Sequence, residues 1–137
     1  MRSGIKPDEA MIEEYKAIKI NRTEKVWILD INNSKLEVVF KGDKNFDFKN
    51  LPDQLPSNQP RFVIYDFDYE TDEVPPRKSS KLIFIFWCPL TAGAQKRFTY
   101  SSSLTEIVST LGAIQKQFQV DDYSQIEYNE IRRQLLK

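Results

Sequence analysis

The feature that most constrains this chain is residues 82–87, LIFIFW, which are six apolar residues in succession. No polar residue alternates with them, and this pattern predicts a β-strand that is buried on both faces. A strand of that kind requires helices on both sides of its sheet. The chain has 137 residues, about the size of one domain. The sequence therefore predicts an α/β (α+β) fold, built as a single domain over residues 1–137.

The remaining periodic segments predict the other strands and the helices. Residues 61–69 are rich in aromatic and β-branched side chains and predict a second central strand, joined to the first by the polar segment 70–80. Residues 26–31 and 36–41 predict a hairpin, and residues 116–120 a last short strand. Helices are predicted over residues 7–20, over a short piece near residues 51–55, over residues 91–111 with Phe98, Leu104 and Val108 in the apolar stripe, and from about the Ser124-x-x-Glu127 capping pattern onward.

The N-terminus and the apolar runs bear on where the protein is found. Residues 1–6 predict a flexible tail and lack an apolar signal core. The longest apolar run, residues 82–90, is far shorter than the roughly 20 residues of a membrane helix. The single cysteine, Cys88, suits a reducing compartment. We expect a cytoplasmic protein.

Composition excludes several classes of function. The chain has no histidine, which rules out Ser-His and Cys-His catalysis and His-ligated zinc. Its 20 Lys and Arg residues balance 20 Asp and Glu residues, so nucleic acid is not an expected partner. The four glycines are widely spaced and form no phosphate-binding loop. We therefore expect a protein without cofactors.

Acidic residues cluster at the end of the second central strand. Asp66, Asp68 and Glu70 alternate along one strand face, as a cation site or the carboxylate pair of a hydrolase would require. A calcium-binding loop from Asp66 would need glycine at its sixth position and glutamate at its twelfth, where this chain has Thr71 and Arg77. Exposed acids at a strand end need no ligand, so we expect neither a metal site nor catalysis here.

Short motifs follow one another in a fixed order along nearly the whole chain. They are SGI at residues 3–5, LP at 55–56, RFVIYDFDYE at 61–70, WCP at 87–89 and YSSS at 100–103. In this combination the sequence resembles the ADF/cofilin family. The resemblance implies an ADF-homology fold, in which a mixed sheet of five or six strands lies between two pairs of helices. It also implies a monomeric, non-catalytic protein of the actin cytoskeleton that binds actin monomers and filaments and severs or depolymerises the filaments.

The resemblance also implies two binding surfaces. Ser3 and Gly4 match the amino-terminal segment that docks on actin in cofilins, where the serine is a site of inhibitory phosphorylation. Arg97, with Lys96 beside it, matches a basic residue of the family's long actin-binding helix. The second surface, which contacts filaments only, is matched by Lys81, Arg133 and Lys137. Without the resemblance, the basic residues on the last two helices are equally well explained as a solvated surface.

The chain departs from the cofilin pattern on the long helix. Leu104-Thr105 and Val108-Ser109 replace residues that are usually charged, so we expect a more apolar contact with actin. Residues 55–62, LPSNQPRF, also resemble glia maturation factor, a relative that acts on the actin-related nucleating complex at filament branches. That complex and phosphoinositide headgroups are further candidate partners.

Overall fold

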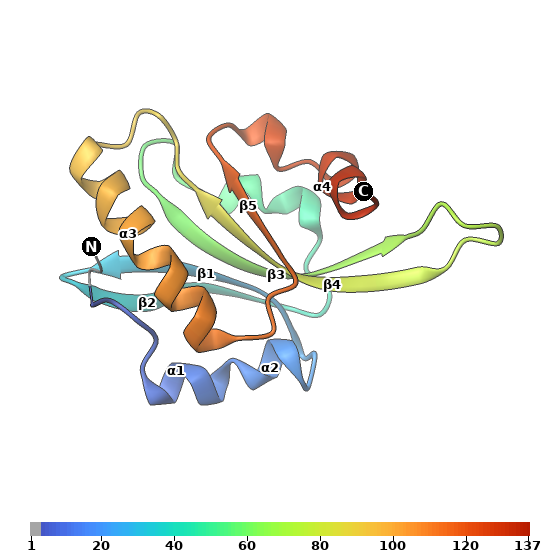
Figure 1. The fold of residues 1–137 in the computed structure, drawn as a ribbon, viewed down its shortest axis with the longest axis horizontal. Helices are drawn as coiled ribbons and strands as arrows, with labels where there is room; N and C mark the ends of the chain where they lie inside the picture. The colour runs from blue at the N-terminus through green and yellow to red at the C-terminus, as the bar shows by residue number, and fades with distance from the viewer. Residues whose placement is uncertain (1–3) are drawn as a thin grey trace.

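Residues 4–137 are described by the computed structural model, in which five strands form one sheet (Figure 1). The strands are β1 (Glu24–Asn32), β2 (Lys35–Asp43), β3 (Arg61–Glu70), β4 (Lys78–Trp87) and β5 (Lys116–Val120). Their order is β2-β1-β3-β4-β5, in which β4 and β5 are parallel and the other neighbours are antiparallel. The predicted mixed sheet is confirmed, and the apolar run at residues 82–87 is the buried part of β4.

Helical segments lie on both faces of this sheet. The α-helices are α1 (Glu9–Glu14), α2 (Lys16–Lys19), α3 (Ala94–Leu111) and α4 (Tyr128–Leu135), and the 3-10 helices are η1 (Phe48–Asn50), η2 (Pro52–Gln54) and η3 (Tyr123–Gln125). One core lies between the sheet and α1, α2 and α3, and the other lies between the sheet and α4, η1 and η2. Successive residues of β4 enter the two cores in turn, Phe84 the first and Ile85 the second. This explains why the run contains no polar residue.

The helix predicted over residues 7–20 is two shorter helices. Asp8 caps α1, since its Oδ1 accepts a hydrogen bond from the backbone N–H of Met11 at 2.8 Å. Tyr15 separates α1 from α2, and its fully buried side chain donates a hydrogen bond to the carbonyl of Gly112 at 2.9 Å. Tyr15 keeps helical backbone angles (φ −59°, ψ −20°), so the break is local and α2 follows α1 directly.

The predicted tail also needs a correction at Ile5. Ile5 is only 7% exposed and packs in the first core, so the packed domain begins there and not after residue 6. An apolar side chain in a polar tail is the sequence signal for this contact.

Two further predictions of helices were wrong in detail. The short helix near residues 51–55 is the 3-10 pair η1 and η2, with Pro52 in the first turn of η2. The last helix begins at Tyr128, because Glu127 is its N-cap and accepts a hydrogen bond from the N–H of Glu130. The capping box forms one turn earlier, between Asp122 and Gln125 on η3.

Of the four glycines, Gly42 has the least room for a side chain. A Cβ atom at Gly42 would lie 2.6 Å from Cγ1 of Val26 and 2.9 Å from the ring of Phe46. We expect Gly42→Ala to lower the free energy of unfolding by about 1–3 kcal/mol, as overpacking does. Urea unfolding would measure this, with Gly93→Ala as the control, since an added Cβ there meets no atom within 4 Å. Equal effects of the two changes would contradict the prediction.

Candidate functional site

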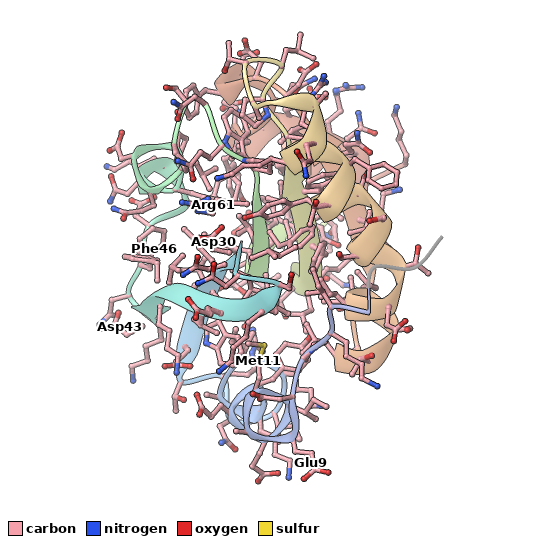
Figure 2. The ribbon with its side chains drawn as sticks, turned by 90° about the vertical axis from the view of Figure 1, so that its left-hand side faces the viewer. Glu9, Met11, Asp30, Asp43, Phe46 and Arg61 are labelled. Atoms are coloured by element: carbon pink, nitrogen blue, oxygen red, sulfur yellow. The ribbon has the colours of Figure 1, made fainter. Side chains whose placement is uncertain are left out.

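The long helix α3 is fixed at its middle by a hydrogen-bonded tyrosine. Tyr100 accepts from the N–H of Ile31 at 2.9 Å and donates to the carboxylate of Asp30. The same carboxylate accepts from Nη1 of Arg61 at 3.1 Å, and Figure 2 shows Asp30 and Arg61 together at this side of the sheet. Burial, together with the bond to Asp30, raises the pKa of Tyr100 to about 12. These contacts fix the position of α3 relative to β1.

Both ends of α3 are held as well. At its C-terminal end, Gly112 adopts a positive φ of 71°, and its carbonyl accepts the hydroxyl of Tyr15. Before its N-terminal end, the hydroxyl of Thr91 donates to the carbonyl of Ser57 at 2.8 Å. The helix is therefore a rigid element, and its outer face is presented in one orientation.

That outer face carries one large apolar side chain and one acidic residue, Glu106, which lies beside Thr105 and Ser109. Tyr100, Ser103, Ile107 and Leu111 point inward and are buried. At 100° per residue, Phe98, Ser102, Thr105 and Ser109 fall on the opposite side. Phe98 is 64% exposed, and Leu90 in the preceding loop is 71% exposed.

One prediction about this helix was wrong. Phe98 does not belong to the buried stripe, because it lies about half a turn away from Tyr100. Leu104 and Val108, by contrast, pack against the first core, as their place in the predicted stripe requires. The exposed apolar side chains on this side are therefore Phe98 and Leu90, and a more apolar contact with actin stays a prediction.

Lys96 and Arg97 lie on the first turn of α3. Lys96 is exposed, whereas Arg97 is half-buried and its Nε has no hydrogen-bond partner among the described residues. Arg97 lies near Cys88 at the end of β4: burial raises the pKa of the Cys88 thiol, although the charge of Arg97 acts in the opposite direction. This turn therefore presents two cations beside the exposed ring of Phe98.

Gly4 and Ile5, the first residues that the structure describes, lie on the same side of the domain as α3. Ser3 lies outside the described residues. Gly4 is exposed, with a φ of +81° and no atom within 4 Å of an added Cβ. The next residue, Ile5, packs in the same core as Tyr100 and Ile107 of α3, and both views show this segment near α3 (Figures 1 and 2). We name Gly4, Leu90, Lys96, Arg97 and Phe98 the α3 surface.

The second candidate surface is formed by β4 and α4. Lys81 of β4 and Leu135 and Leu136 at the end of α4 line one open hollow of about 480 Å³. Arg133 forms an ion pair with Glu130 at 2.7 Å, and this bond raises the pKa of Arg133 and lowers that of Glu130. We name Lys81, Arg133 and Lys137 the α4 surface.

The two surfaces are well separated. Lys81 and Trp87 are both on β4, with α3 following the Trp87 end, and six strand residues span about 20 Å. A partner that contacts both surfaces at once is therefore large, or consists of two subunits.

The acidic cluster differs from its prediction. Asp66 is only 7% exposed, and it accepts two hydrogen bonds from Arg22, at 2.9 and 3.3 Å. Asp66 is therefore half of an ion pair and not an exposed acid. Within residues 4–137, no three His, Cys, Asp or Glu side chains are placed to hold a metal ion, and no helix is long and apolar enough to cross a membrane.

Comparisons with known proteins decide the family. A sequence model for "Cofilin/tropomyosin-type actin-binding protein" matches residues 4–136. The chain belongs to this cofilin/ADF family. The cofilin of Yarrowia lipolytica is 29% identical over 131 residues, which are 95% of this chain and 85% of the relative. The resemblance found in the motifs is thus confirmed.

Solved structures share the cofilin/ADF fold with this chain. A crystal structure of Streptomyces griseoflavus cofilin superposes with a TM-score of 0.84 at 26% identity, over 96% of each chain. The solution structure of glia maturation factor from Caenorhabditis elegans superposes with a TM-score of 0.73 at 20% identity, over 97% of this chain and 95% of that one. The roles of Ser3, Gly4, Lys81, Lys96, Arg97, Arg133 and Lys137 stay predictions.

Proposed function

We propose that this protein binds actin monomers through the α3 surface and actin filaments through the α3 and α4 surfaces together, and that it promotes filament turnover by severing or depolymerisation. The observation that carries the proposal is the match to the family of actin-binding proteins over residues 4–136. The rigid α3, with Phe98 exposed beside Lys96 and Arg97, supports it, since a hot spot commonly combines an aromatic anchor with a cation.

Turnover follows from a difference in affinity. A ligand shifts a conformational equilibrium only by binding one state more tightly than the other. The protein would bind a twisted filament state in preference to the relaxed one, and so weaken contacts between subunits. No step of this turnover makes or breaks a covalent bond, so we propose a non-catalytic protein. We also propose that it is cytoplasmic and acts as a monomer.

Co-sedimentation with actin filaments, combined with fluorescence microscopy of single filaments, tests this proposal. We expect the protein to sediment with filaments at micromolar concentration and to produce severing or faster loss of subunits. Absence of binding, severing and accelerated subunit loss would refute it.

A glia maturation factor activity is the second candidate. The stretch Leu55-Pro56-x-x-Gln59-Pro60-Arg61-Phe62 supports it, and this segment is held firmly, since the carbonyl of Pro56 accepts from Nε1 of Trp87 at 2.7 Å. The partner would then be the actin-related nucleating complex. Loss of branches from a branched network without severing would favour this activity.

Phosphoinositide headgroups are a third candidate partner, through Lys96 and Arg97. Vesicles with and without these lipids would test this, and actin should compete for the same cations.

Ser3 offers a test of the amino-terminal contact. We expect Ser3→Glu to weaken actin binding, because a charge at a docking segment adds repulsion and bulk, as a phosphate of charge about −2 would. Ser3→Ala is the control and should bind like the wild type. Binding curves with labelled monomers measure both variants, and thermal unfolding should be nearly the same for all three proteins. Equal binding by Ser3→Glu would show that this residue is not at the contact.

A further inference from the structure

The outer half of the β3–β4 hairpin extends beyond the rest of the sheet. The pairing of β1 with β3 stops at Val26 and Tyr65, whereas β3 continues to Glu70. We name residues 66–82 the hairpin arm, which projects from the sheet in Figure 1. Within the described chain, the arm pairs with no strand along its β3 edge.

The backbone of β3 directs polar groups to that open edge. The N–H of Thr71 donates to the carbonyl of Arg77 at 2.8 Å, so Thr71 points its backbone groups toward β4. Antiparallel strands alternate in this respect, and Glu70 and Asp68 therefore point theirs outward. The carbonyl of Glu70 does accept an outside donor, Nε of Arg132, at 2.8 Å.

Two arginines from different elements hold the open edge. Arg22, between α2 and β1, contacts Asp66 at 2.9 and 3.3 Å and Asp68 at 3.4 Å. Arg132, on α4, contacts the carbonyl of Glu70 and also Oδ1 of Asp72 at 2.7 Å. A guanidinium group bonds two acceptors at once in a fixed geometry, which lysine cannot do.

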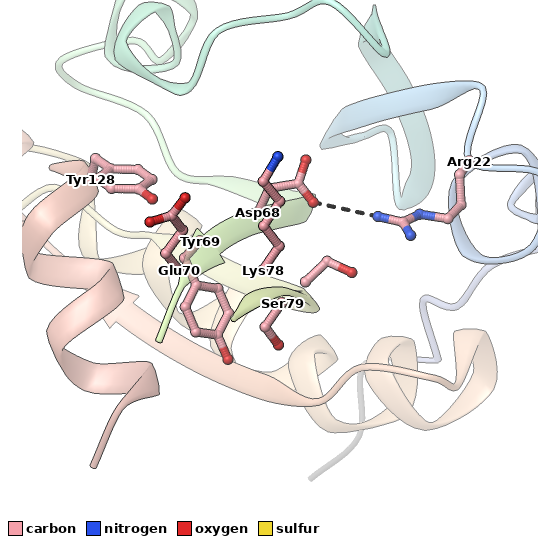
Figure 3. A pocket seen from close by; sticks show the side chains of 8 residues that line it. Arg22, Asp68, Tyr69, Glu70, Lys78, Ser79 and Tyr128 are labelled. Atoms are coloured by element: carbon pink, nitrogen blue, oxygen red, sulfur yellow. Dashed lines mark hydrogen bonds and ion pairs between the residues drawn. The ribbon is translucent and has the colours of Figure 1, made fainter. Parts of the chain in front are cut away.

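The base of the arm is packed against α4, since Phe67 stacks on Tyr128 with ring centroids 5.1 Å apart and Tyr69 is buried in the second core. Lys25 also pairs with Asp68. Beside the outer part of the arm lies a hollow of about 560 Å³, with Arg22 on one side and Tyr128 on another (Figure 3). Beyond Tyr69, Arg132 supplies the contacts to α4, through Glu70 and Asp72.

The α4 surface is divided between the two parts that Arg132 joins. Lys81 lies on the arm, whereas Arg133 and Lys137 lie on or just after α4. We infer that Arg132 and Arg22 are positioning residues, of which Arg132 holds the outer part of the arm against α4 and Arg22 holds its base, so that the arm and the cations of α4 contact a filament together. This inference rests on the proposed function.

The change Asp72→Asn distinguishes an effect of arm positioning on filament binding from an effect of charge alone. It removes a negative charge next to a basic surface, so electrostatics alone would strengthen binding to an anionic partner. If Asp72 and Arg132 position the arm, the same change weakens filament binding. We expect about a tenfold loss for Asp72→Asn, and a similar one for Arg132→Lys, which keeps the charge but not the two contacts. Asp53→Asn, an exposed acid on η2, is the matched control and should bind like the wild type.

The measurement compares filament co-sedimentation with binding of labelled monomers. Monomer affinity should stay within about twofold of the wild type in every variant, because the α3 surface is distant. An equal loss for monomers and filaments would indicate general damage and overturn the inference. Unchanged or stronger filament binding by Asp72→Asn would also overturn it.

The arm itself supplies a readout without actin. Arg22→Lys keeps a cation near buried Asp66, so the variant should fold, and it should speed amide hydrogen exchange in the arm by about tenfold while leaving α3 unchanged. Unchanged exchange in both Arg22→Lys and Arg132→Lys would refute the positioning role. A wild-type protein that binds no filaments would refute the proposed function and this inference together, whereas variants that bind as well as a binding wild type would refute the inference alone.

Discussion

Replacing Lys96 and Arg97 together with alanine is expected to weaken binding to actin monomers by about 2–5 kcal/mol, the range for charges truncated from a buried interfacial pair. Arg97 is already half-buried in the free protein, with an Nε that lacks a partner among residues 4–137. Titration of labelled monomers with wild type and variant measures the difference.

The matched control is Arg133→Ala with Lys137→Ala. This variant also loses two cations, but from the α4 surface, so it should lose filament binding and keep monomer binding. If monomer binding is indifferent to the change at Lys96 and Arg97, α3 is not the principal actin-binding element.

A salt series adds a second readout to the same titration. Beyond its first turn, the outer face of α3 carries Phe98, Thr105 and Ser109 and a single charged residue, Glu106. Salt screens exposed charges and leaves apolar contacts intact. Actin affinity should therefore fall only gently with added salt, and a steep loss would contradict the apolar contact.

The largest change in stability is expected at alkaline pH. Burial raises the pKa of Tyr15, Tyr65 and Tyr100 above the ordinary value of 10.0, and that of Tyr100 reaches about 12. Below pH 10 all three side chains are neutral in both the folded and the unfolded protein, so their ionisation does not lower the free energy of unfolding there. Above about pH 10, the unfolded chain loses three protons that the folded chain keeps, and stability falls by about 4 kcal/mol per pH unit. A domain of ordinary stability would unfold near about pH 12.

Circular dichroism and tyrosinate absorbance, followed together against pH, measure this effect. The absorbance that comes from the three buried tyrosines should change together with the circular dichroism, because these side chains ionise only on unfolding. Tyr65→Phe is the control, since it removes one of the three groups and should reduce the slope by about one-third. Ionisation of all tyrosines while the circular dichroism stays native would contradict the prediction.

Local pattern predicted the strands better than the positions of side chains on α3. The run at residues 82–87 could be assigned because burial on both faces leaves a direct mark, the absence of polar residues. Phe98 left no such mark, since an aromatic residue next to a helical stripe fits an apolar core as well as a docking surface. Its exposure depends on where the first turn of α3 passes the edge of the sheet.

Contacts between distant residues could not be predicted from the sequence at all. Arg132 bonds Glu70 and Asp72 across about 60 positions of chain. Arg22 likewise meets Asp66 from a different element, which turns an apparently exposed acid into a buried one. Charge runs at both sites were visible, but a charge run is compatible with solvent, a ligand or an internal partner. Only the fold selects the partner.

The crossover from β4 through α3 to β5 bears on the proposed filament turnover. α3 connects two parallel, adjacent strands, and Tyr100 and Tyr15 tie it to the domain as well. A protein held in this way would dock with little ordering of its chain. When such a rigid body meets a pliable polymer, the mismatch between them is relieved in the polymer. The twist would be borne by the filament.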